Sequence, residues 1–324
     1  MKHLGQNEYK NVDGERKMSE QRIGFVGLGN MGAPMVENFL AAGLTVTAFD
    51  IDPSRVTPLV DKGAVQASSV AQVAREVDVL FSSLPTAESV EEVVTGAHGL
   101  VEGAKAGLVY VDTSTVPPPL CARLANELTG HGVTMLDAPV SGGKAGAHAG
   151  TLSIMVGGPM AAYNKCRPLF EVIGSVIGHF GEKVGSGMHA KLANQIMVGI
   201  HLAALSEAMA YGAKAGLQLD RLAELLQAGR AGSEILSVNG PPILAGNIEE
   251  IGAMGPMTLL HKDMHCIVES MEEMGVRDSL SKKVHAMYDK LINQDRNAGT
   301  PIRDGMGLIY LSEEMFDVDV VDVS

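Results

Sequence analysis

The feature that most constrains the fold is a glycine-rich turn placed between a short apolar run and a helix-forming run. The sequence GLGNMG, residues 27–32, has the spacing G-x-G-x-x-G. It closes an expected strand at 22–29 and opens a helical stretch, and the next apolar run, 45–50, ends in Asp50. This order predicts a βαβ unit that binds a dinucleotide. The glycines allow a tight turn, let the backbone approach a pyrophosphate and permit close helix packing.

The same segment predicts which dinucleotide is bound. A helix N-terminus offers free N–H groups and a partial positive charge to phosphates. Asp50 lies where a carboxylate accepts hydrogen bonds from the ribose hydroxyls of NAD and repels the 2′-phosphate of NADP. We therefore expect NAD, with NADP as the alternative because Arg55 follows closely; we interpret Arg55 as a solvated helix residue. The expected cofactor contacts in this segment are Gly27, Leu28, Gly29, Asn30, Met31, Gly32 and Asp50.

The two halves of the chain have different patterns. The first half alternates short apolar strands, expected at 77–85, 107–115 and 151–158, with helical stretches, which is typical of a parallel sheet. A Gly/Ala-rich loop is expected at 141–150. From Met188 to Leu217 about 30 residues show helical periodicity without proline, and further helical stretches follow.

These patterns predict an α/β fold. An N-terminal Rossmann-type, doubly wound, mostly parallel sheet is followed by an all-helical C-terminal domain, joined by a long helix. We expect a flexible N-terminal extension over 1–20, a dinucleotide-binding domain over 21–184 and a helical substrate and oligomerisation domain over 185–324.

Composition excludes several function classes. The formal net charge of −13 argues against a nucleic-acid partner and against an anionic membrane surface. Three widely spaced cysteines argue against a disulfide scaffold or a zinc ribbon and favour a cytoplasmic setting. The polar N-terminus is no signal peptide, and no run of about 20 apolar residues predicts a membrane span.

Five motifs occur in the order and spacing of the β-hydroxyacid dehydrogenases: GLGNMG, DTSTVPP, DAPVSGGKAGAHAGTLSIMVGG, GSGMHAKLANQ and HKDM. Over about residues 22–303 the chain resembles this family, which includes 3-hydroxyisobutyrate dehydrogenase and tartronate semialdehyde reductase (2-hydroxy-3-oxopropionate reductase). The segments GTLSIMVGG and KLANQ are more similar to the latter. The resemblance implies an NAD(P)-dependent oxidoreductase that interconverts a small carboxylated semialdehyde and its β-hydroxy acid.

The expected proton donor is Lys191, near the start of the long apolar helix. Desolvation there and a nearby nicotinamide cation would lower the pKa of its amine towards working pH. The resemblance implies that Lys191 is the acid in reduction and the base in oxidation. Asn194 and Gln195 share its helix face, and either amide would orient the lysine and bind the substrate. Gln195 departs from the asparagine that is common in the family.

The expected substrate carboxylate site is the turn Ser141, Gly142 and Gly143, because successive glycine N–H groups form a small anion nest. The resemblance implies that Thr115 faces the nicotinamide and the substrate, with Ser114 as its neighbour. Thr115 ends an expected strand at the sheet edge where ligands bind in such folds.

The resemblance also places two further segments near the cofactor. Leu84 and Pro85 occupy a loop that lies against it in relatives, and Lys262 matches a lysine that approaches it from the helical domain. Asp263 is expected to be structural. We expect a homodimer or homotetramer, as in relatives.

Two departures leave the substrate open. Pro256 stands where relatives often have an aromatic residue, and the tail DGMGLIYLSEEM differs from the usual ending. The alternatives are the same fold acting on succinic semialdehyde, sulfolactaldehyde or glyoxylate, or a non-catalytic cofactor-binding scaffold. The presence of Lys191 argues against the scaffold.

No metal site is expected. His261 and His265 have the i, i+4 spacing that brings two imidazoles together, but no glutamate follows His261 as it does in the metalloprotease pattern. No third ligand is evident in the sequence, so we interpret both as ordinary helix residues.

Overall fold

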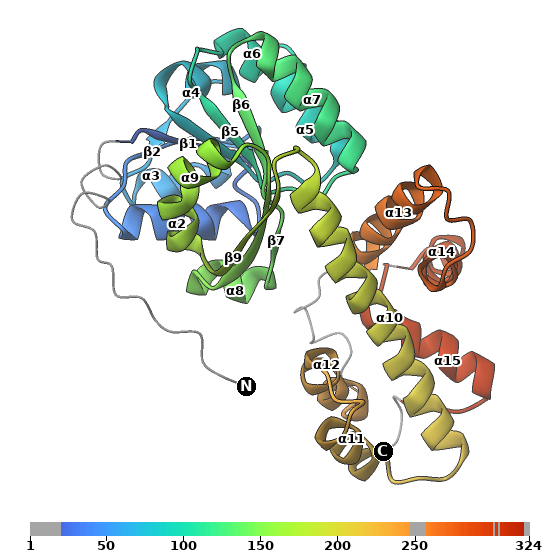
Figure 1. Cartoon of the computed structure of the whole chain (residues 1–324). Helices are drawn as coiled ribbons and strands as arrows, with labels where there is room; N and C mark the ends of the chain where they lie inside the picture. The colour runs from blue at the N-terminus through green and yellow to red at the C-terminus, as the bar shows by residue number, and fades with distance from the viewer. Residues whose placement is uncertain (1–20, 247–256, 301, 304, 321–324) are drawn as a thin grey trace, which may run out of the picture. The chain divides into compact units, whose positions relative to one another are not determined.

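The computed structural model describes residues 21–246, 257–300, 302–303 and 305–320 (Figure 1). The chain divides into two compact units between His189 and Ala190. The sequence-based boundary between residues 184 and 185 lies slightly earlier. The expected N-terminal extension and Pro256 fall outside the described residues.

The first unit is built on one sheet, which has nine strands among the described residues. Its strand order is β3-β2-β1-β4-β5-β6-β8-β7, and β9 pairs with β8. Strands β1 to β6 are parallel, whereas β8 runs antiparallel to β6 and β7 and parallel to β9. The strands are β1 (Ile23–Val26), β2 (Val46–Phe49), β3 (Val65–Gln66), β4 (Val79–Ser82), β5 (Val109–Asp112), β6 (Thr134–Asp137), β7 (Val140–Ser141), β8 (Leu152–Gly157) and β9 (Gly174–Gly181).

Helices connect these strands and cover both faces of the sheet (Figure 1). They are α2 (Gly32–Ala41), α3 (Thr57–Val60), α4 (Val70–Glu76), α5 (Ala87–Thr95), α6 (Leu100–Gly103), α7 (Pro118–Gly130), α8 (Gly143–Ala149) and α9 (Met160–Ile173), with a 3₁₀ turn η1 (Pro53–Arg55).

Alternation along the strands divides the core between the two faces. Phe25 and Phe81 point into one cluster with side chains of α2, α3, α8 and α9, where their rings stack 6.1 Å apart. Val26 and Leu80, one position along, point into the other cluster with α4, α5, α6 and α7. The sheet is therefore covered on both sides, as a mostly parallel sheet requires.

Helix α2 ends in a glycine turn. Gly43 follows the cap residue Ala42 with φ +79°, a conformation that glycine adopts without cost. Its N–H donates to the carbonyl of Leu40, and the N–H of Leu44 donates to that of Phe39. This double reversal is a Schellman motif, which stops the helix and aims the chain into β2.

The expected loop at 141–150 is wrong in part, because residues 143–149 form helix α8. Its alanines favour a helix, and Ala147 is fully buried in the core. Asn38 Nδ2 of α2 also donates to the carbonyl of Ala147 at 2.7 Å. Strand β9 was not predicted either, because its three glycines weaken the strand pattern.

The second unit is helical. The long helix α10 spans Ser186–Lys214, close to the prediction of 188–217, and its last 25 residues belong to this unit. The other helices are α11 (Leu219–Ala228), α12 (Glu234–Leu244), α13 (Met257–Glu273), α14 (Leu280–Ala298) and α15 (Leu308–Phe316), with a 3₁₀ turn η3 (Gly305–Gly307). Their apolar faces form one core that includes Met209, Met264 and Tyr288.

The sequence predicted no membrane span, but α10 is long and apolar enough to cross a membrane by length and composition alone. Its most apolar window has a mean hydropathy of 1.3, and 39% of that window is buried within the protein. Core helices of folded proteins meet the same criteria, so this is weak evidence for a span.

Candidate functional site

The glycine turn between β1 and α2 has the geometry that a bound pyrophosphate needs. Gly27 has φ +88°, and a Cβ there would meet the carbonyl oxygen of Ser83. A Cβ on Gly32 would meet the carbonyl oxygen of Gly27. At Gly29, by contrast, the nearest atom to such a Cβ is Arg55 Nη1, 3.6 Å away. The first and third glycines thus pack against backbone, and the second leaves room for a ligand.

The N-terminus of α2 is the second part of this turn. Its cap residue, Met31, makes no side-chain hydrogen bond to the first turn of the helix. Asn30 beside it is exposed. Within the first turn of α2, the N–H of Ala33 already donates to the carbonyl of Gly29 at 3.1 Å, and Pro34 has no N–H. The helix dipole still favours an anion at this end. The residues fit a dinucleotide phosphate.

Asp50, just after β2, is buried and braces the turn. Its Oδ2 accepts a hydrogen bond from the N–H of Leu28 at 2.6 Å, and its Oδ1 accepts one from the N–H of Asp52 at 2.9 Å. A carboxylate has about four acceptor sites, so ribose hydroxyls could still bind it. The structure adds a bracing role that the sequence analysis did not predict.

Arg55 lies closer to the cofactor turn than the sequence interpretation assumed. Its Nε is 3.5 Å from Asp52 Oδ2, its side chain is 53% exposed, and its Nη1 lies near Gly29. A guanidinium beside this turn bears on the choice between NAD and NADP.

The carboxyl ends of β4 and β5 are joined by hydroxyl hydrogen bonds. The N–H of Leu84 donates to Ser114 Oγ at 2.9 Å, and Ser114 Oγ donates to Asp112 Oδ1 at 2.6 Å. A Cβ on Gly27 would lie 2.8 Å from Leu84 Cδ2. The structure thus brings Leu84 and Ser114 to the glycine turn, at the sheet edge where ligands bind in such folds.

Three further predicted residues, Pro85, Thr115 and Ser141, lie at or soon after the ends of β4, β5 and β7. Thr115 is half-buried and Pro85 is exposed. Ser141 ends β7, where it pairs with Ser153 of β8. The backbone then turns through Gly142 and Gly143.

The Gly142–Gly143 turn requires glycine. The two residues have φ +130° and +60°, and both are exposed. Backbone N–H groups in such a turn are able to contact an anion.

Asp137, which the sequence analysis did not single out, anchors the start of α10. It is fully buried at the end of β6. Its Oδ1 accepts from the N–H of Gly185 at 2.7 Å and its Oδ2 from that of Met188 at 2.6 Å. Burial raises the pKa of this carboxyl to about 6, while the two N–H donors act in the opposite direction.

In the second unit, Lys191 is held in a side-chain network. It is 6% exposed, and its Nζ donates to Gln195 Oε1 at 3.1 Å. Asn194 Nδ2 donates to the same oxygen at 2.9 Å. Gln195 Nε2 in turn donates to Asp263 Oδ2 at 2.6 Å. The structure therefore brings Lys191, Asn194 and Gln195 together.

The environment of Lys191 favours its neutral form. Burial lowers the pKa of its ammonium group, the charge of Asp263 raises it, and that of Lys262 lowers it. Lys262 Nζ lies 3.2 Å from Asp263 Oδ1. Asp263 thus contacts both Gln195 and Lys262. A structural role was expected for it, but its contact with Gln195 was not.

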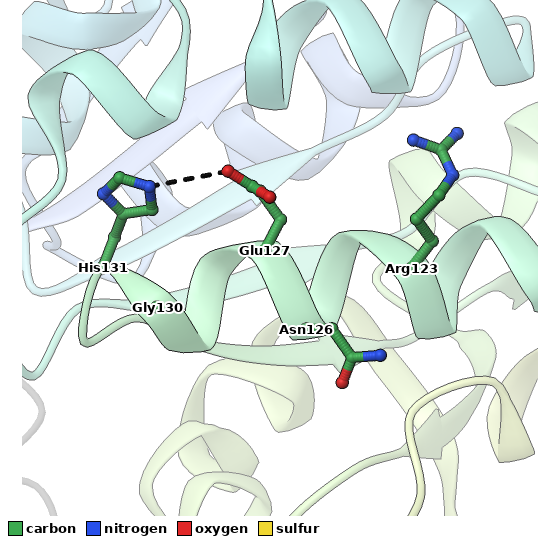
Figure 2. A pocket seen from close by; sticks show the side chains of 5 residues that line it. All are labelled: Arg123, Asn126, Glu127, Gly130 and His131. Carbon is green, nitrogen blue, oxygen red and sulfur yellow. Dashed lines mark ion pairs between the residues drawn. The ribbon is translucent and has the colours of Figure 1, made fainter.

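The first unit also has a surface hollow. It opens widely to solvent and is lined by residues of the last turns of α7 and its C-cap, Arg123, Asn126, Glu127, Gly130 and His131, whose side chains Figure 2 shows. Its only drawn ion pair joins His131 to Glu127 at 3.6 Å. None of the predicted site residues lines it.

Comparisons with known proteins decide the family. One family model, the NAD binding domain of 6-phosphogluconate dehydrogenase, matches residues 22–181, and another, the NAD-binding of NADP-dependent 3-hydroxyisobutyrate dehydrogenase, matches 185–301. The 2-(hydroxymethyl)glutarate dehydrogenase of Eubacterium barkeri is 35% identical over 299 residues, 92% of this chain and 97% of that protein. The chain belongs to the β-hydroxyacid dehydrogenase family.

Two further relatives of this β-hydroxyacid dehydrogenase support the same family. The 2-hydroxy-3-oxopropionate reductase of Escherichia coli (strain K12) is 37% identical over 256 residues, 79% of this chain and 86% of that protein. A solved structure of Mycobacterium tuberculosis 3-hydroxyisobutyrate dehydrogenase with L-serine is 28% identical, with a TM-score of 0.78 over 90% of this chain and 98% of that one. The predicted fold class and the use of NAD or NADP are confirmed, and the chain is an oxidoreductase of CH–OH donors.

Proposed function

We propose that this β-hydroxyacid dehydrogenase interconverts a short carboxylated semialdehyde and its β-hydroxy acid. Tartronate semialdehyde (2-hydroxy-3-oxopropionate) and the 3-hydroxyisobutyrate pair are the first candidates. The observation that carries the proposal is the buried Lys191, whose amine is held by Gln195 and shifted towards its neutral form. A general acid or base works best when its pKa lies near the working pH.

The residues divide the reaction between them. The bound nicotinamide supplies or accepts the hydride. In reduction Lys191 gives its proton to the carbonyl oxygen as negative charge develops, and in oxidation its neutral amine removes the hydroxyl proton. The amide oxygen of Gln195 fixes the Nζ of Lys191, so we assign Gln195 chiefly a positioning role.

The remaining predicted residues bind the reactants. Backbone N–H groups of Gly142 and Gly143, with Ser141, hold the substrate carboxylate, because an exposed glycine turn lets an anion approach closely. Thr115 and Asn194 orient the carbonyl. Lys262 approaches the cofactor, and its charge suits a phosphate.

We also propose that NAD is preferred to NADP. Asp50 places a carboxylate at the end of β2, where it repels a 2′-phosphate. Asp52 Oδ2 engages the guanidinium of Arg55, which leaves that cation partly neutralised. The carboxylate of Asp50 and the ion pair of Arg55 with Asp52 therefore both favour NAD, which lacks the 2′-phosphate.

We further propose that this dehydrogenase is cytoplasmic and forms a homodimer or homotetramer, with no membrane or nucleic-acid partner. Its long helix carries exposed Met197 and Tyr211, which are 54% and 63% exposed. Association of apolar helix faces would bury such side chains. Light scattering of the purified chain decides this: a single mass equal to one chain would overturn the oligomer.

The activity is tested by following NADH and NADPH oxidation against a panel of short aldehydes. The panel holds tartronate semialdehyde, methylmalonate semialdehyde, succinic semialdehyde, sulfolactaldehyde, glyoxylate and 2-formylglutarate, the oxidised form of 2-(hydroxymethyl)glutarate. The controls are Lys191→Ala and the exposed Lys283→Ala of the same unit. We expect a high rate with one of the first two aldehydes and NADH, lost in Lys191→Ala and kept in Lys283→Ala.

The other outcomes are equally informative. A high rate with another aldehyde would keep the mechanism and replace the substrate. Tight NADH binding without reduction of any aldehyde would overturn the proposal and favour a non-catalytic cofactor-binding scaffold.

A further inference from the structure

Helices α13 and α14 bring together a group of imidazoles and carboxylates that the dehydrogenase chemistry does not use. His261 and His265 lie four residues apart on α13, and His285 and Asp289 lie four residues apart on α14. Residues at this spacing share one helix face. The two faces meet, because α13 and α14 pack against each other.

The contacts within this group, which we call the His–Asp cluster, are close. His261 Nε2 lies 2.7 Å from Asp289 Oδ1, and His285 Nδ1 lies 3.4 Å from Asp289 Oδ2. The rings of His261 and His285 stack with centroids 4.9 Å apart and planes 17° apart. The ring of His265 lies 5.5 Å from that of His285.

The spacing of the ligand atoms suits one small cation. One such atom from each of His261, His285 and Asp289 lies within 4.8 Å of the others. Ligands of tetrahedral zinc, at bond lengths of about 2.0–2.1 Å, lie roughly 3.3 Å apart. Modest side-chain rotations therefore close the site, and all three residues are only half-buried, which leaves a path for entry.

His285 is the most buried side chain of the three. The side chain of His285 is 15% exposed, and its Nε2 is buried without a hydrogen-bond partner among the described residues. A neutral imidazole keeps the lone pair that a metal needs.

We propose that His261, His285 and Asp289 bind one divalent transition-metal ion of the Zn²⁺ type, which ties α13 to α14. Two imidazoles and a carboxylate favour zinc, nickel or copper over magnesium or calcium, which prefer oxygen ligands. Water or His265 completes the coordination. The ion has a structural role, because Lys191 already serves as the acid and base of the proposed reaction.

The rival explanation is that the His–Asp cluster is a hydrogen-bonded tie without a cation. The test uses the full-length, tag-free chain, stripped with a chelator and titrated with Zn²⁺ in a calorimeter. We expect one equivalent to bind with a Kd of micromolar order or tighter, and Mg²⁺ not to compete. Added Zn²⁺ should also raise the melting temperature by several degrees.

Variants locate the ion. His285→Gln and Asp289→Asn should each weaken Zn²⁺ binding at least tenfold. The matched control is His131→Ala, which removes another imidazole paired with a carboxylate four residues away; within the described part of the chain no other ring packs against it. Its Zn²⁺ affinity should equal that of the unmodified chain.

Co²⁺ provides a readout that is independent of activity and of variant stability. Bound by the cluster, Co²⁺ should give the strong visible absorption of a four-coordinate site. The proposal fails if the Kd is weaker than about 100 µM, if His285→Gln binds as tightly as the unmodified chain, or if Co²⁺ keeps its six-coordinate spectrum. None of these readouts depends on the identity of the substrate.

Discussion

The two units satisfy their buried functional groups in different ways. In the sheet unit, Asp50 and Asp137 accept their hydrogen bonds from backbone N–H groups. In the helical unit, Lys191, Gln195 and Asp263 bind one another's side chains. Backbone donors do not titrate and their position follows from the turn, so they give a rigid frame. In the helical unit, burial lowers the pKa of Lys191, and the charged side chains of Asp263 and Lys262 act on it as well.

The largest effect is expected at Asp137, whose contribution to the free energy of unfolding should depend on pH. Its pKa is raised from 3.8 in the unfolded chain to about 6 in the folded one. Its stabilising contribution is therefore present below pH 3.8 and lost as the pH rises through 6, a change of roughly 3 kcal/mol. Urea unfolding from about pH 4 to 7 should show this change in the unmodified chain relative to Asp137→Asn.

Asp78 provides a control of opposite sign. Its hydrogen bond with Arg22 lowers its pKa to about 2, so its contribution is present above pH 3.8 and lost only as the pH falls towards 2. If the difference between the unmodified chain and Asp137→Asn is flat between pH 4 and 7, the backbone donors outweigh the burial of Asp137.

The second test breaks the backbone frame itself. Gly32→Ala places a Cβ against the carbonyl oxygen of Gly27, so the turn must open. We expect a loss of about 2 kcal/mol in unfolding free energy and at least tenfold weaker NADH binding, measured by urea titration and by NADH fluorescence. Gly130→Ala, at the end of α7 with nothing within 4 Å, is the control. Equal effects in the two variants would refute the packing argument.

The third test breaks the side-chain network. Asp263→Asn removes the charge that raises the pKa of Lys191 and weakens the hydrogen bond to Gln195. The high-pH limb of kcat/KM for reduction should move to lower pH, and stability should fall by about 1.5 kcal/mol. Glu314→Gln, an exposed acid paired with Lys290, should leave the limb in place. A limb that stays fixed in Asp263→Asn would show that Lys191 does not control it.

The smallest effect is expected at the exposed edge of the cofactor turn. Arg55 is 53% exposed and its pairing with Asp52 is long at 3.5 Å, so its charge is screened by solvent. Arg55→Ala should lower kcat/KM for NADPH about two- to threefold and leave that for NADH unchanged. Arg167→Ala, which removes another exposed ion pair, should change neither. A tenfold loss with NADPH would make Arg55 a true phosphate ligand.

The sequence predicts the sheet unit more completely than the helical one. Glycines at 27, 29 and 32 carry their roles locally, because a positive φ or a close backbone approach depends on adjacent residues. Helix α8 was not predicted, because its glycines offset the helix propensity of its alanines. Its stability comes from packing against α2.

In the helical unit the decisive contacts join distant positions. Asp263 reaches Gln195 across 68 residues, and His261 reaches Asp289 across 28. Spacing along one helix predicted that Lys191 shares a face with Asn194 and Gln195, and that His261 lies beside His265. The partners on the facing helices depend on helix packing, which no local pattern encodes.

The central claim is that the sheet unit holds the cofactor and Lys191 supplies the proton. The most direct test measures NADH affinity and the single-turnover rate of hydride transfer in Lys191→Ala, with the best aldehyde of the panel. The account predicts an NADH Kd within about threefold of the unmodified chain and a rate lower by about 10²–10⁴. A rate within tenfold of the unmodified chain, with NADH still bound, would contradict it.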